Sequence, residues 1–136
     1  MTNQSPRKTV DVFYWSQRLE TARAFLRSAQ QDVVLAEPGQ NMSPAVSQIV
    51  LSAIAFGDSL TAKRANVVNQ QDHSAAPKLL REKLGNALPQ AQERRYRRLL
   101  SHKDAVQYGA KPVTLSDAKM LLAELEEFSN WVDSVI

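Results

Sequence analysis

Cysteine is absent from the 136-residue chain, and its absence removes whole classes of chemistry. Without cysteine there is no disulfide, no thiolate nucleophile and no zinc site of the kind that needs sulfur. Glycine is scarce as well: the four glycines are scattered, so the sequence has no glycine-rich phosphate loop. So few tight-turn residues also argue against an all-β fold.

Membrane spans and metal-binding patterns are missing too. The longest apolar stretch, 49–60, is interrupted by Ser52 and Asp58, so it predicts a buried core helix and not a membrane span. The two histidines, His73 and His102, lack the Glu three residues earlier that a di-iron helical bundle would need. No apolar signal-peptide core follows the polar N-terminus. We therefore expect a cytoplasmic protein with no metal and no cofactor.

The spacing of apolar residues predicts an all-α protein, with four long helices and one short helix in an up-and-down-like bundle and no sheet. Ser43 followed by Pro44 is typical of a helix start, and so is Thr114 three residues before Asp117. Apolar residues recur every three or four positions in four segments, namely 10–35, 43–67, 89–108 and 114–136.

The chain has the size of one domain. At 136 residues and 15.2 kDa it can bury a single core. Because the helical pattern begins at residue 10, we expect a flexible N-terminus over 1–9 and one helical bundle over 10–136. The short helix lies between the second and third long helices, where Asp72 or Ser74 can cap its start and Gly85 can end it.

Charge is distributed unevenly around a net charge of +3. The last segment, 114–136, has five carboxylates against one lysine. The segment 93–103 has one acid, Glu93, against five cations. The cations are Lys103 and a basic cluster of four residues: Arg94, Arg95, Arg97 and Arg98. Two interpretations remain open for this cluster. The arginines can contact phosphates of RNA or a nucleotide, or they can pair with the acidic last helix.

Asp58 stands out because it lies inside the most apolar helix. Burying a carboxylate is unfavourable unless a partner compensates for the lost water. Asp58 is therefore either partly exposed on the second long helix, or it faces a polar seam or a cation. In the second case it is a candidate catalytic residue.

Several features together resemble the HEPN domains (higher eukaryotes and prokaryotes nucleotide-binding). These features are the order of the helices, the small and aromatic residues over 47–61, Asp72-His73 at the start of the short helix, and the run Lys103-Asp-Ala-Val-Gln-Tyr108-Gly before a capped last helix. The similarity covers roughly residues 15–132. HEPN domains are small helical bundles common in prokaryotic toxin–antitoxin and defence systems, so the resemblance implies the same fold.

The resemblance also implies a site. Active members of the family are metal-independent ribonucleases whose motif is Arg, a polar residue, variable positions and then His. By helix order, Lys103 stands at the Arg position, Asp104 at the polar position and Tyr108 at the His position. An alternative register, Arg97 with His102, matches the motif literally. Lysine lacks the planar guanidinium fork and tyrosine is a poor general base at neutral pH, so we favour an inactive domain.

The family's motif is completed across two protomers, so the resemblance implies a homodimer. It also implies RNA or a nucleotide as the ligand and a nucleotidyltransferase-type protein as a partner. A different function remains open, since basic and acidic helices side by side are also typical of a helical module that binds other proteins without catalysis.

Overall fold

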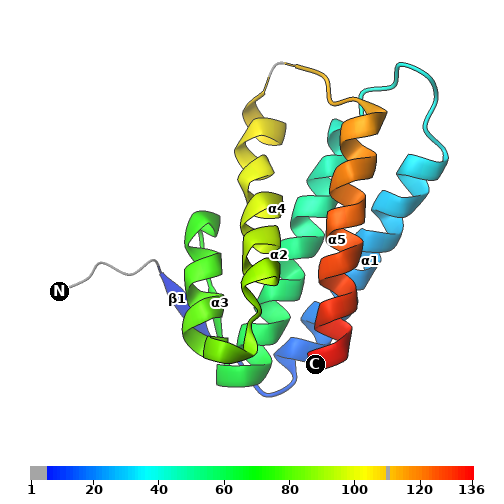
Figure 1. The fold of residues 1–136 in the computed structure, drawn as a ribbon. Coiled ribbons are helices and arrows are strands. Elements are labelled where there is room, and N and C mark those ends of the chain that lie inside the picture. The colour runs from blue at the N-terminus through cyan, green and yellow to red at the C-terminus, as the bar shows by residue number, and fades with distance from the viewer. Residues whose placement is uncertain (1–5, 110) are drawn as a thin grey trace.

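The computed structural model describes residues 6–109 and 111–136, and the side chains of all of these except 105–108. Figure 1 shows the four long helices side by side, running alternately up and down, with the short helix alongside α4. The predicted all-α bundle is confirmed. Its helices within the described residues are α1 (Tyr14–Val34), α2 (Ser43–Ala65), α3 (Ala76–Leu84), α4 (Gln90–Tyr108) and α5 (Leu115–Val135).

Helix α2 is the centre of the core. It is apolar on nearly all sides and contacts α1, α3, α4 and α5. By length and composition alone this helix could cross a membrane, yet 83% of its most apolar window is buried inside the fold. The helix α2 is therefore the core helix of the bundle, as its interrupted apolar stretch predicts.

Aromatic packing draws α4 and α5 onto α2. The ring of Tyr96 on α4 stacks on Phe128 of α5 at 5.1 Å, and Phe56 of α2 meets Phe128 edge-on at 6.4 Å. At Gly57 a Cβ atom would lie only 2.5 Å from Cζ of the buried Tyr96. Only glycine at this position lets α4 approach α2 so closely.

The expectation of no sheet is wrong by one short strand pair. Strand β1 (Arg7–Thr9) pairs antiparallel with β2 (Val67–Asn69). The second long helix was expected to reach residue 67, but it ends at Ala65 because Asn66 adopts a left-handed conformation with φ of 54°. The β-branched residues that follow then extend as a strand.

This strand pair holds part of the segment that we expected to be flexible. Arg7 donates two hydrogen bonds to Glu82 of α3, at 2.8 and 3.2 Å. Val10 is buried against Ala62 and Val68. Its backbone N–H donates to the Asn66 carbonyl at 2.9 Å, which explains why α1 begins at Tyr14 and not at Val10.

The helix starts agree with the sequence in one case and differ in another. Thr114 caps α5 as predicted, with its hydroxyl accepting from the Asp117 N–H at 3.1 Å. Ser43 is the first residue of α2 and not its cap. Instead, Oδ1 of Asn41 accepts from the backbone N–H of Ser43 and of Val113, both at 3.1 Å. This single side chain therefore ties the start of α2 to the segment before α5.

Candidate functional site

The 3-10 helix η1 (His73–Ala75) presents a histidine to the middle of α4. Asp72 caps η1 as predicted: its Oδ1 accepts from the Ser74 N–H at 3.0 Å and from the Ser74 hydroxyl at 2.5 Å. These hydrogen bonds hold the pKa of the Asp72 carboxyl below its usual value, so the cap is ionised at neutral pH.

A cleft of about 370 Å³ separates the η1 region from α4. It brings together two residues of the predicted motif, Lys103 and Asp104, and the histidine that opens the short helical region. Polar side chains predominate in the cleft. One wall is formed by Gln71, Asp72, His73, Ser74 and Pro77, and the other by Arg97, Leu100, Ser101, Lys103 and Asp104.

His73 is half-buried in this cleft, and its Nδ1 atom is buried without a hydrogen-bond partner among the described residues. Burial lowers the pKa of the imidazole, and the positive charge of Lys103 lowers it further, although Asp72 acts in the opposite direction. The imidazole is therefore neutral at neutral pH, and its ring lines the cleft beside α4.

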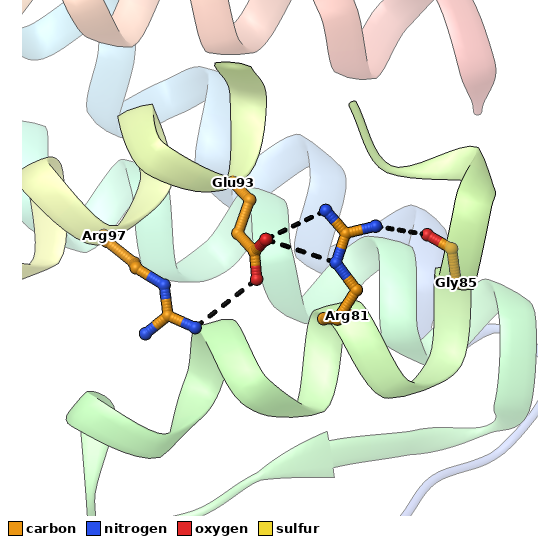
Figure 2. A network of polar contacts seen from close by, with 4 residues as sticks. All are labelled: Arg81, Gly85, Glu93 and Arg97. Carbon is orange, nitrogen blue, oxygen red and sulfur yellow. Dashed lines mark hydrogen bonds and ion pairs between the residues drawn. The ribbon is translucent and has the colours of Figure 1, made fainter. Parts of the chain in front are cut away.

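A polar network fixes α4 against α3 beside the cleft, and Figure 2 shows its members. Arg81 of α3 donates to Oε1 of Glu93 at 2.9 and 3.2 Å and to the Gly85 carbonyl at 2.6 Å. Arg97 reaches the other carboxylate oxygen of Glu93 at 3.4 Å. The hydrogen bonds from Arg81 hold the pKa of Glu93 below its usual value. The network orients the two helices that carry the cleft walls.

Most of the predicted basic cluster makes contacts inside the molecule. Arg95 and Arg98 pair with Glu124 of α5, at 2.8 and 3.1 Å. For these two residues the structure favours the second interpretation, pairing with the acidic last helix. Arg97 lines the cleft while pairing with Glu93. Arg94 is exposed, and it has no ion pair with any residue that the structure describes.

The alternative register does not form one site within the chain. Arg97 faces the cleft, whereas His102 lines a separate cavity of about 620 Å³ between the end of α4 and the start of α5. Residues five apart on a helix point about 140° away from each other, which accounts for this separation. The side chain of Tyr108 lies outside the described part of the chain.

Asp58 is buried, with 8% of its surface exposed, so the expectation of a partly exposed residue is wrong. The alternative, a cation partner, is confirmed: Nε of Arg18 on α1 lies 3.3 Å from Oδ2 of Asp58. Burial raises the pKa of Asp58 to about 6, against the opposing effect of Arg18. Asp58 does not line the cleft, but Arg18 is close enough to lower the pKa of His73 as well.

Sequence reasoning missed two members of this region. In the sequence, His73 stands out only as the residue that opens the short helix. Lys103, which lines the same cleft, is thirty positions away along the chain. Arg18 is one of three regularly spaced arginines on α1 and has nothing in its own sequence context to single it out. The only available signal was the buried carboxylate of Asp58, which requires a cation from another helix.

The described residues contain no group of three histidines or carboxylates able to hold a metal ion. The sequence matches no protein-family model, and no curated protein is similar to it. The chemistry of the cleft is therefore what indicates a function. A neutral imidazole and an ammonium group are donors suited to phosphate oxygens, whereas the hydroxyls of Ser74 and Ser101 already donate to Asp72 and to the Arg98 carbonyl.

Proposed function

We propose that this chain is an RNA-directed helical domain of the HEPN type, which holds a single-stranded phosphodiester backbone in the cleft between η1 and α4. The observation that supports the proposal is that Lys103, the cation of the predicted motif, lies beside the unpartnered imidazole of His73. Arg97, on the same wall as Lys103, adds a second cation. These groups bind phosphate oxygens without reading a base, so we expect little sequence preference.

The domain binds RNA and does not cleave it. Cleavage through the 2′-hydroxyl needs a base for that proton and an acid for the leaving oxygen. The cleft contains one imidazole, and one group cannot take the proton from the 2′-hydroxyl and give a proton to the leaving oxygen in the same step. His102 lies on the other side of α4. Any reaction is therefore carried out by a separate catalytic protein, of the nucleotidyltransferase type that the HEPN resemblance implies.

The same resemblance implies a homodimer, and the absence of cysteine fits a location in the reducing cytoplasm. Two-fold dimers are the commonest oligomers of soluble proteins. Light scattering at micromolar concentration is expected to give about twice the chain mass of 15.2 kDa. A mass equal to that of one chain would exclude the dimer.

Binding of a labelled single-stranded oligouridylate at pH 6 and low salt tests the RNA proposal. We expect Lys103→Ala to weaken binding about three- to tenfold and to reduce the salt slope by about 0.7, the value for one lost contact to single-stranded nucleic acid. Lys119→Ala is the matched control, because Lys119 is an exposed lysine on α5 that does not line the cleft. His102→Ala should bind like the wild type, and the RNA should stay intact.

Two results would overturn the proposal. One is wild-type binding that does not depend on Lys103, and the other is no binding at all. Metal-independent cleavage that disappears in His102→Ala would instead show that the alternative register is active.

The cavity between α4 and α5 favours a second function, binding to another protein. It has a volume of about 620 Å³ and is lined mainly by apolar side chains, among them Val113 and Leu121. Met120 at this cavity is 67% exposed, and exposed methionines are typical of adaptable protein-binding surfaces. Under the first proposal Met120→Glu leaves RNA affinity unchanged. If the chain is only an interaction module, no variant or wild type binds RNA.

A further inference from the structure

The charges that line the cleft are balanced at neutral pH. The cations are Arg97 and Lys103 of α4, and the carboxylates are Asp104 of α4 and Asp72 of the loop before η1. Two ion pairs, Arg18 with Asp58 and Arg81 with Glu93, lie outside this lining, although Arg18 is close enough to lower the pKa of His73. Tyr14 and Tyr96 lie near Asp58, and burial raises their pKa, so they stay uncharged.

We propose that RNA binding in this cleft is coupled to the uptake of protons by His73 and Asp58, which convert a charge-balanced site into a cationic one. This inference rests on the proposed function and adds its regulation. An RNA backbone meets no net attraction while two cations and two carboxylates line the cleft, so protons must supply the excess positive charge.

His73 is the first proton acceptor. Its imidazole lines the cleft together with Lys103, so an anion bound there can stabilise a proton on the ring. Lys103 opposes protonation in the free protein, as the lowered pKa of His73 reflects. A phosphate between the two side chains would neutralise Lys103 and accept a hydrogen bond from the imidazolium, so binding the strand and protonating His73 favour each other.

Asp58 is the second proton acceptor and acts through Arg18. The pair is asymmetric, because the side chain of Arg18 is 29% exposed and that of Asp58 only 11%. Protonation of Asp58 removes the negative charge and leaves Arg18 with an uncompensated positive charge near His73. Because burial already raises the pKa of Asp58 to about 6, Asp58 takes up this proton as the pH falls through that value.

The test is the affinity for an oligouridylate without terminal phosphates, measured at pH 5.5 and 7.5 at constant ionic strength. Terminal phosphates are omitted because they titrate near pH 6 themselves. We expect wild-type affinity to rise about tenfold on acidification, and Asp58→Asn to bind about threefold more tightly than wild type at pH 7.5 with a smaller pH dependence. His73→Gln should retain only the share of the pH dependence that Asp58 contributes.

The matched control is Asp133→Asn, which removes one carboxylate from an exposed ion pair with Arg23. It should bind with wild-type affinity at both pH values. A second variant, Arg18→Gln, should lower affinity at pH 5.5 and so tests the same pair if Asp58→Asn does not fold.

The outcomes separate the two proposals. If Asp58→Asn binds RNA with the same affinity as wild type, both at pH 5.5 and at pH 7.5, the proton coupling is wrong while RNA binding stands. The same holds if wild-type affinity does not change with pH. If wild type binds RNA at neither pH, the proposed function is wrong, and the coupling is wrong with it.

Discussion

Asp58 is a single residue whose ionisation acts against folding. Its folded pKa of about 6 exceeds the ordinary value of 3.8, so the fold favours the neutral acid even with Arg18 nearby. A raised carboxyl pKa contributes stability that is present below the ordinary value and is lost as the pH rises through 6. We therefore expect Asp58→Asn to be more stable than wild type by about 3 kcal/mol at pH 7.5 and similar to it near pH 4.

Urea unfolding of both proteins at the two pH values measures this difference. Carboxylates that arginines stabilise, such as Glu93, titrate in the opposite direction, but they are common to both proteins and cancel. A loss of stability in Asp58→Asn that is equal at pH 4 and pH 7.5 would show that the residue acts through its shape and not its charge.

Gly57 is a second residue whose role is local. A methyl group there would overlap the ring of Tyr96, whose Cζ lies 2.5 Å from the Cβ position, and α4 would have to move away from α2. We expect Gly57→Ala to lower the free energy of unfolding by about 1–3 kcal/mol, as overpacking usually does. Combining it with Tyr96→Leu should cost less than the sum of the two single changes. Additive losses in thermal unfolding would contradict the steric explanation.

At the scale of secondary-structure elements, the joint between α3 and α4 is held by Arg81. Its guanidinium bonds Glu93 and the Gly85 carbonyl at once, which a lysine ammonium on a flexible stem cannot reproduce with the same geometry. Since 32% of the Arg81 side chain is exposed, we expect Arg81→Lys to cost only about 1 kcal/mol. RNA affinity should also fall, because α3 carries the η1 wall of the cleft.

The matched control for Arg81→Lys is Arg27→Lys, on the exposed side of α1, where the described residues give Arg27 no ion pair. Chemical unfolding of the two variants should differ by the cost of the network. Equal stability would mean that the α3–α4 joint is held by apolar packing alone.

The elements also show how far the sequence can be interpreted alone. Apolar periodicity predicted the long helices, and the hydroxyl of Thr114 predicted the cap of α5, because both depend on neighbours within four residues. The strands β1 and β2 were missed because three-residue strands have no pattern of their own, and their pairing joins segments about sixty residues apart.

The candidate site also has features that the sequence can predict and features that it cannot. That Arg97 and His102 point apart follows from helix geometry and could be predicted. That Lys103 meets His73, and that Asp58 meets Arg18 forty positions earlier, depends on how η1 and α1 pack on the bundle. Tertiary contacts of this kind cannot be predicted from the spacing of residues along a single helix.

At the scale of the whole molecule, two hollows on opposite sides of α4 correspond to the two proposed functions, RNA binding and protein binding. The cleft at η1 is polar, and the cavity at α5 is mainly apolar. The net charge of +3 provides weak general attraction for RNA, but most of the basic cluster is engaged by carboxylates. RNA binding must therefore depend on one local site and not on a broad basic surface.

Backbone amide chemical shifts, recorded at pH 6 while an oligouridylate is added, test this central claim most directly. The account predicts that the largest changes fall on 71–77 and 97–104, the two walls of the cleft, with a rise in the pKa of His73 when RNA is bound. Changes confined to Val113, Met120 and Leu121 around the other cavity, or no changes, would contradict it.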